Sequence, residues 1–156
     1  MKVIELFAGI GSQRKALDRL GINHEVAAIV EWDKYAYKSY EAIHGKTLNL
    51  GDIRKVEKLP YCDLLTYSFP CQDLSVAGKG AGIKEGTRSG LLYEVERLLK
   101  VYENKPTYLL LENVKNLVGK QHKPDFDKWL LTLEQMGYSN YWQVLNAKHY
   151  GIPLIS

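Results

Sequence analysis

The sequence predicts an α/β fold built on a mostly parallel sheet. Short apolar runs typical of buried strands alternate with amphipathic helical patterns, and turn-forming glycines separate them. Such alternation is typical of βαβ units, in which helices cover a parallel sheet. The 156 residues are enough for one ordinary domain and leave little room for a second. We therefore expect a single domain over residues 1–156, with no internal repeat.

Four apolar runs predict strands in the first half of the chain. They span Lys2–Phe7, Glu25–Val30, Leu48–Ile53 and Asp63–Phe69. The third run is short and ends in a glycine-containing turn. The fourth run stops at Pro70, because proline has no N–H to donate to a sheet ladder.

Two helical patterns connect the first three of these strands. The first covers Gln13–Leu20, with Ser12 as its candidate N-cap and Gly21 as the residue that closes it. The second covers Asp33–Ile43, is capped by Asp33 and ends near Gly45. These lengths match crossover helices between parallel strands.

The second half of the chain opens with a glycine-rich stretch. Residues 78–90 hold five glycines and no apolar face, which predicts a long loop of the kind that is usually functional. Helices are then expected at Leu91–Tyr102 and Asp125–Met136, and strands at Thr107–Glu112 and Asn140–Asn146.

Composition excludes several classes of protein. Hydrophobic residues make up 46% and charged residues 25%, a globular balance unlike that of disordered or fibrous chains. The net charge of +3 permits a nucleic-acid partner without arguing for one. Cys62 and Cys71 are too few for a disulfide framework or a four-thiolate zinc site, and the four histidines show no metal-ligand spacing. With no signal peptide or membrane-spanning stretch in view, we expect a reducing, cytoplasmic location.

A glycine pair between the first strand and the first helix predicts a cofactor site. In the segment FAGIGS, residues 7–12, glycine lets the backbone approach a ligand and the helix start offers N–H groups to an anion. About 20 residues further on, Glu31 ends the second strand where an acidic residue typically binds ribose hydroxyls. Trp32 could pack on an adenine ring, and Asp52 could accept from its amino group. The alternatives are a plain tight turn, a solvated strand end and an ordinary turn aspartate.

Two residues at later strand ends are candidates for chemistry. Cys71 follows the fourth strand beside the glycine-rich loop, where a cysteine with a lowered thiol pKa could act as a nucleophile. Cys62 instead matches the commoner fate of cysteine, which is burial in the core. Glu112 ends a run of leucines and is a candidate general acid, or otherwise a solvent-facing strand end.

These motifs together resemble the cytosine-C5 DNA methyltransferase family. ELFAGIGS resembles its cofactor-binding motif, SFPCQDLSVAGKG its catalytic PCQ motif and mobile loop, GTRSGLLYEVERLL its arginine-containing helix, and LLLENVKNL its ENV motif. LNAKHYGIP resembles the segment that leads into the family's Q-x-R-x-R motif. The matches follow the family order along nearly the whole chain. Ser12 and Ser68 stand where the family commonly has glycine.

The resemblance implies a Rossmann-like methyltransferase fold that binds S-adenosylmethionine and acts on DNA. The implied cofactor contacts are Phe7, Gly9, Gly11, Ser12, Glu31, Trp32, Asp52, Ile53, Pro70 and Leu91. The implied catalytic residues are Cys71, Glu112 and Arg88, and the implied nucleic-acid contacts are Gln72, Ser75, Lys79 and Lys84. The residues Lys115, Lys120, His122 and Lys123 either contact phosphates or form a solvated basic face.

The family pattern continues after Pro153 into Q-x-R-x-R, a target-recognition domain and a closing motif, whereas Leu154, Ile155 and Ser156 follow here. We therefore expect a sheet that is incomplete at its C-terminal side, a poorly anchored segment 140–147, and activity that needs a second polypeptide carrying the remaining half. The alternatives are an inactive fragment with weak cofactor binding, an RNA cytosine methyltransferase relative, and a nucleotide-binding or protein-interaction module.

Overall fold

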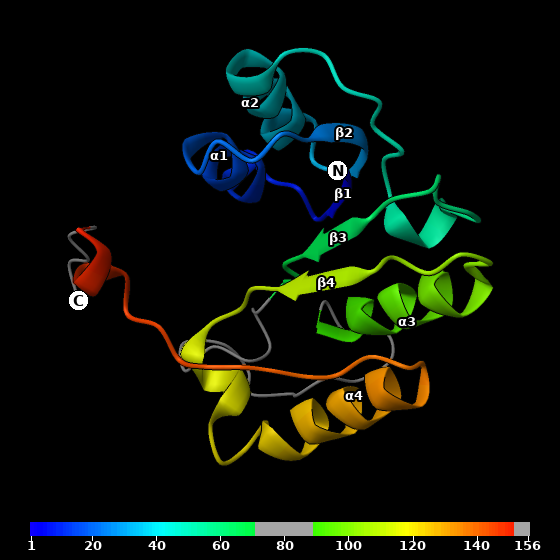
Figure 1. Cartoon of the computed structure of the whole chain (residues 1–156), viewed down its shortest axis with the longest axis vertical. Helices are drawn as coiled ribbons and strands as arrows, with labels where there is room; N and C mark the ends of the chain where they lie inside the picture. The colour runs from blue at the N-terminus through cyan, green and yellow to red at the C-terminus, as the bar shows by residue number, and fades with distance from the viewer. Residues whose placement is uncertain (71–88, 152–156) are drawn as a thin grey trace. The chain divides into compact units, whose positions relative to one another are not determined.

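The computed structural model describes residues 1–70 and 89–151 (Figure 1). The chain divides into two compact units, Met1–Val114 and Lys115–Ser156.

The first unit is built on a four-stranded parallel sheet. Its strands are β1 (Lys2–Leu6), β2 (Glu25–Val30), β3 (Leu64–Tyr67) and β4 (Tyr108–Leu111), in the order β2-β1-β3-β4. Its helices are α1 (Ser12–Arg19), α2 (Lys34–His44) and α3 (Leu92–Val101), with short 3-10 turns at Ile53–Lys55 and Ser89–Leu91. The parallel α/β architecture predicted from the sequence is confirmed.

The register of the sheet brings the carboxyl ends of all four strands to one edge. Leu6 of β1 pairs with both Val30 of β2 and Tyr67 of β3, and Tyr67 pairs with Leu111 of β4. Ligands of open parallel sheets bind outside this edge. A ligand site is therefore expected among the segments that follow the four strands.

Burial differs across the sheet. The central strands β1 and β3 are buried on both faces, with Val3, Ile4 and Leu65 fully inaccessible to solvent. Each such aliphatic side chain contributes about 1.5–3 kcal/mol through burial. Strand β4 alternates between exposed and half-buried residues, with Tyr108 62% and Leu110 49% exposed. Within the described residues β4 is therefore an edge strand.

Local capping explains where the helices begin. Asp33 caps α2 as predicted, and its side chain accepts hydrogen bonds from the backbone N–H groups of Tyr35 and Ala36. The prediction that Ser12 caps α1 is wrong, because Gly11 occupies the N-cap position with a left-handed backbone and Ser12 is the first helical residue. A glycine can adopt that conformation without the steric cost that serine would incur.

The predicted strand Leu48–Ile53 is reduced to one bridge. Asn49 bridges Ile29 of β2, and the ladder extends no further. The Asn49 side chain instead bonds the backbone of Glu31, directly after β2, and of Gly51.

Over its described residues, 115–151, the second unit contains the α-helix α4 (Lys123–Gln135) and 3-10 turns at Lys115–Val118 and Ala147–Tyr150. The predicted strand Asn140–Asn146 is wrong: this segment pairs with no strand among the described residues, and Tyr141 is 94% exposed. An alternating pattern cannot form a ladder without a partner strand. Trp142 packs edge-on against Phe126 of α4, with 5.8 Å between ring centroids.

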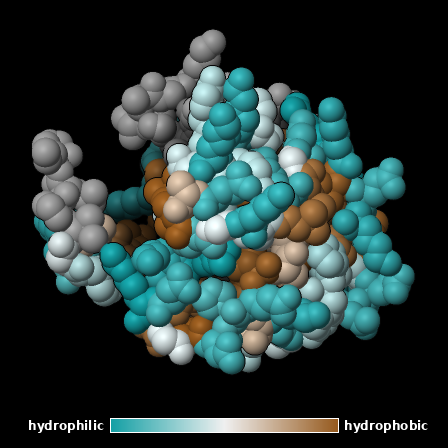
Figure 2. All heavy atoms as spheres, turned by 90° about the horizontal axis from the view of Figure 1, so that it is seen from above, coloured by the Kyte–Doolittle hydropathy of each residue, from teal (hydrophilic) through white to brown (hydrophobic). Residues whose placement is uncertain are grey.

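Hydrophilic side chains dominate the face drawn in Figure 2, and hydrophobic residues emerge between them as separate patches. The larger exposed hydrophobic residues near α1 and α2 in sequence are Ile10, Leu20, Ile22, Trp32, Tyr35 and Ile43. None of the helices in the described part of the chain is long and apolar enough to cross a membrane.

Candidate cofactor and catalytic site

The turn after β1 contains three residues with a left-handed backbone. Phe7, Gly9 and Gly11 all have positive φ, at 55°, 55° and 78°. The turn is fixed by backbone hydrogen bonds from Ala8 N–H to Val30 O and from Gly11 N–H to Ala8 O. A non-glycine residue in the left-handed region costs about 1–2 kcal/mol, so Phe7 stores strain directly beside the two glycines.

The two glycines of this turn serve different purposes. A Cβ built on Gly9 meets no atom within 4 Å, so the backbone there is open to a ligand. A Cβ on Gly11 would lie 2.4 Å from His44 Nε2 and 2.7 Å from Tyr40 Cε2. Gly9 thus provides an accessible surface, whereas Gly11 allows α1 to pack against α2.

Glu31 connects the ends of β1 and β2. Its side chain accepts hydrogen bonds from Gly9 N–H and Asp33 N–H, both at 2.8 Å, and the residue is only 8% exposed. The Asn49 side chain, which the sequence analysis missed, holds the backbone of Glu31: its Oδ1 accepts from Glu31 N–H at 3.1 Å and its Nδ2 donates to Glu31 O at 2.9 Å. The alternative of a solvated strand end is therefore wrong. A carboxylate has about four acceptor positions, so acceptor capacity remains after the two backbone bonds.

Asp52 is already engaged by a neighbour. The Arg54 guanidinium binds both carboxylate oxygens, with Nη2 2.6 Å from Oδ2 and Nε 2.9 Å from Oδ1, and Arg54 N–H adds a bond of 3.1 Å. These contacts lower the pKa of Asp52. Trp32 and Ile53 were expected beside Asp52 among the cofactor contacts. Trp32 is 68% exposed, while Ile53 is 3% exposed and belongs to the core.

Two side chains that the sequence analysis missed hold the segment before Cys71. Gln13 of α1 donates to Ser68 Oγ at 2.7 Å, and Asn113 donates through Nδ2 to Phe69 O at 3.0 Å. Ser68 therefore has a structural role that a glycine could not have. The ENV motif contained the signal for Asn113, since an amide directly after a strand end can bond neighbouring backbone.

Glu112 lies at the same sheet edge but in a different environment. It is exposed, and its backbone N–H donates to Tyr67 O at 3.2 Å. Leu91 ends the 3-10 turn before α3 and is half-buried. The predicted residues Cys71, Gln72, Ser75, Lys79, Lys84 and Arg88 lie outside the described residues.

The prediction that Cys62 is a core cysteine is confirmed. Cys62 is fully buried, its Sγ lies 3.6 Å from Tyr102 Oη, and burial raises the pKa of its thiol. Such a thiol resists ionisation and is a poor nucleophile.

The basic cluster of the second unit is not uniformly exposed. His122 is 1% exposed and cannot contact a phosphate in this conformation. Lys123 forms an ion pair with Asp127 and lies 5.5 Å from the Trp142 ring centroid, while Lys115 and Lys120 are exposed. Within residues 1–70 and 89–151 no group of three or more His, Cys, Asp or Glu side chains could hold a metal ion.

Comparison with known proteins agrees with this geometry. The family described as C-5 cytosine-specific DNA methylase matches residues 1–154. The type II methyltransferase M2.ScrFI of Lactococcus lactis subsp. cremoris is 40% identical, over 98% of this chain and 58% of its own length. The type II methyltransferase M.NgoBI of Neisseria gonorrhoeae is 40% identical, over 97% of this chain and 47% of its own length.

A solved structure supports the same fold. The crystal structure of the S. pombe Dnmt2 methyltransferase has a TM-score of 0.77 and 25% sequence identity to this chain, and the match covers 98% of this chain and 47% of the other. The chain thus spans about half the length of the relatives that it matches. The glycine turn, the buried Glu31 and these matches lead to one conclusion: the chain belongs to the C-5 cytosine-specific DNA methylase family.

Proposed function

We propose that this chain is the cofactor-binding and catalytic segment of a DNA cytosine-C5 methyltransferase that uses S-adenosylmethionine. The observation that carries the proposal is the bond between the Glu31 carboxylate and Gly9 N–H. This bond puts an acceptor for ribose hydroxyls next to open glycine backbone, at the sheet edge where nucleoside cofactors bind.

The described residues suit this cofactor unequally. When bound, S-adenosylmethionine supplies an electrophilic methyl group. Phe7, Gly9, Gly11 and Ser12 would hold its methionine portion, Glu31 its ribose, Trp32 and Asp52 its adenine, and Pro70 and Leu91 the remaining wall. Gly9 and Glu31 suit these roles directly, because one is open and the other keeps free acceptor positions. Ile53 would act from the core, because its side chain is buried.

The proposed chemistry is a covalent addition and elimination. The Cys71 thiolate forms a bond to C6 of cytosine, and the electrons of the C5–C6 double bond make C5 a nucleophile. S-adenosylmethionine would supply the methyl group that C5 accepts and would leave as the neutral thioether. A base then removes the C5 proton, the double bond re-forms and the thiolate leaves. Glu112 would hydrogen-bond N3 and the amino group of the ring, and so stabilise charge developing there.

Binding the nucleic acid requires further residues. The target base must leave the duplex before Cys71 can reach it. Gln72, Ser75, Lys79 and Lys84 would contact the nucleic acid, and Arg88 would support the site. The relatives are about twice as long as this chain. We therefore also propose that target recognition uses further residues, carried by a second polypeptide.

Covalent trapping tests the nucleophile. With S-adenosylmethionine and duplex DNA containing 5-fluorocytosine, Cys71 should form a stable adduct, because fluorine blocks the loss of the C5 substituent. The variant Cys71→Ser should form none, whereas Cys62→Ser should react like the parent, since Cys62 is buried and its thiol pKa is raised. An adduct on Cys62, or a reactive Cys71→Ser variant, would contradict the assignment. Because the proposal includes a second polypeptide for target recognition, the adduct should form when that polypeptide is present and not with this chain alone.

The same assay separates DNA from RNA. Folded RNA with 5-fluorocytosine is offered in parallel with the DNA duplex at equal concentration. An adduct on DNA alone supports the proposal, and an adduct on RNA alone replaces it with the RNA methyltransferase alternative.

A further inference from the structure

The carboxylate of Glu5 lies buried beneath the glycine turn. Glu5 belongs to β1, is 1% exposed, and accepts from the Tyr40 hydroxyl at 2.5 Å and from Arg14 N–H at 3.1 Å. Burial raises the pKa of Glu5, while the bonds from Tyr40 and Arg14 act in the opposite direction. A buried carboxylate is normally retained only where such bonds satisfy it.

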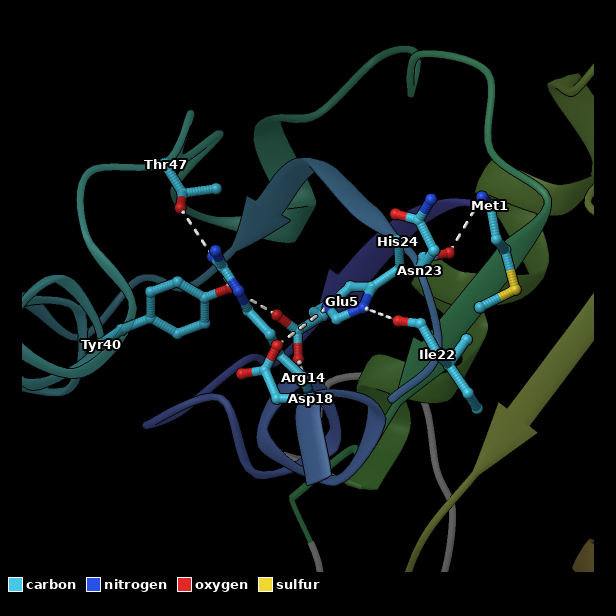
Figure 3. A network of polar contacts seen from close by, with 9 residues as sticks. All are labelled: Met1, Glu5, Arg14, Asp18, Ile22, Asn23, His24, Tyr40 and Thr47. Atoms are coloured by element: carbon cyan, nitrogen blue, oxygen red, sulfur yellow. Dashed lines mark hydrogen bonds and ion pairs between the residues drawn. The ribbon is translucent and has the colours of Figure 1, made fainter. Parts of the chain in front are cut away.

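Tyr40 connects this carboxylate to a cation. Its hydroxyl accepts from Arg14 Nη1 at 3.2 Å while it donates to Glu5, and Arg14 Nη1 also donates to Thr47 Oγ1 at 3.1 Å (Figure 3). Glu5, Arg14 and Tyr40 therefore form a relay that ties β1, α1 and α2 together. Burial and the bond to Glu5 also raise the pKa of Tyr40, so its hydroxyl stays protonated at neutral pH.

The relay bonds the backbone in the first turn of α1, directly after the glycine turn. Gly11 has no side chain to cap the helix, so Glu5 takes over part of that function by accepting from Arg14 N–H. Tyr40 and His44 also pack against the position where a Cβ of Gly11 would lie, and His44 Nε2 lies 3.1 Å from Ile10 O. α2 therefore packs against the turn at Gly11 and Ile10, whereas the position at Gly9 stays open.

We propose that Tyr40 is a positioning residue for the cofactor-binding turn. It does not contact the cofactor, and it acts by holding Glu5 and Arg14 so that residues 9–12 keep their ligand-binding backbone conformation. This inference rests on the proposed function insofar as the ligand of the turn is S-adenosylmethionine. It adds that cofactor affinity depends on a hydroxyl of α2, behind the site.

The variant Tyr40→Phe removes the hydroxyl and keeps the ring against Gly11. Tyr37→Phe is the matched control, because Tyr37 is on the same helix and also makes two hydroxyl bonds, to Glu41 Oε1 and Thr47 O, neither of which reaches Glu5. Calorimetry with S-adenosylhomocysteine, well below the unfolding temperature of both variants, should give about tenfold weaker binding for Tyr40→Phe, as for loss of one hydrogen bond to a charged group. Tyr37→Phe should bind within about twofold of the parent chain.

Residue-resolved amide exchange in the ligand-free chain supplies the second measurement. The amides of Gly11 and Arg14 should exchange about tenfold faster in Tyr40→Phe and remain unchanged in Tyr37→Phe. Equal affinities for the two variants would overturn the inference, and so would equal exchange. If the parent chain itself does not bind S-adenosylhomocysteine, the proposed function fails, and amide exchange alone decides whether Tyr40 positions the turn.

Discussion

Glu31 and Glu112 follow parallel strands of the same sheet, yet they meet opposite environments. Glu31 is 8% exposed, and its carboxylate is bonded to two backbone N–H groups. Glu112 is exposed, and its one described bond is made by its backbone N–H. The β1–β2 end of the sheet thus has its acidic group fixed by the fold, whereas the β3–β4 end presents its acidic group to solvent.

This difference indicates how the two ends are prepared for function. A side chain held by several bonds is preorganised and binds without further loss of entropy. The β1–β2 end achieves this with residues 1–50 alone, through Glu31, Asn49 and the glycine turn. At the β3–β4 end Gln13 bonds the Ser68 hydroxyl and Asn113 bonds the Phe69 carbonyl, while the Glu112 side chain is exposed. We therefore expect substitutions to affect stability at the first end and chemistry at the second.

The largest expected effect is at the glycine turn. Gly11→Ala combines a left-handed backbone with a clash against Tyr40 and His44, and should lower the free energy of unfolding by about 2–5 kcal/mol. Gly9→Ala meets no neighbour and should lose only about 1–2 kcal/mol through backbone strain. Urea unfolding followed by circular dichroism measures both. Equal losses would mean that α2 does not restrict the turn.

A matched pair of isosteric substitutions tests the comparison directly. Glu31→Gln places an amide where two backbone donors converge, and should lower the free energy of unfolding by about 1–3 kcal/mol. Glu112→Gln changes an exposed side chain and should stay within about 0.5 kcal/mol of the parent chain. The same unfolding experiment measures both variants. A larger loss for Glu112→Gln would reverse the assignment of the fixed and open ends.

The smallest expected effect is at Arg54, which forms an ion pair with Asp52, the carboxylate expected to bind adenine. Arg54→Ala should raise the pKa of Asp52 toward its ordinary value, because the Arg54 hydrogen bond is the main cause of the lowering. NMR titration of the Asp52 carboxyl carbon measures this. Arg54 is largely exposed, so solvent screens the pair, and S-adenosylhomocysteine should bind at most about fivefold more tightly to the variant. Weaker binding would show that Arg54 supports the adenine site instead of competing for it.

Much of the fold could be predicted because its signals are local. The strand Glu25–Val30 was predicted with the bounds that it has, and Asp33 was identified as the cap of α2. The prediction of a strand at Asn140–Asn146 was wrong, because an alternating pattern does not show whether a partner strand is present. The prediction that Ser12 caps α1 was wrong, because Gly11, with its left-handed backbone, occupies the N-cap position.

The candidate site was predictable only in part, for a related reason. Glu31 could be identified from its distance to the glycine turn and its place at a strand end. The relay of Glu5 and Tyr40 joins residues 35 positions apart, and no periodicity within one helix or strand reports such a pair. Arg54 was missed as well, although it lies two positions from Asp52, because sequence spacing does not show which donor a carboxylate selects.

The left-handed backbone of Phe7 sets two contributions to stability against each other at a single position. A glycine there would relieve about 1–2 kcal/mol of backbone strain, but it would also remove a half-buried aromatic ring and make the unfolded chain more flexible. The conformation of the turn therefore depends on the packing of the Phe7 ring as well as on its two glycines.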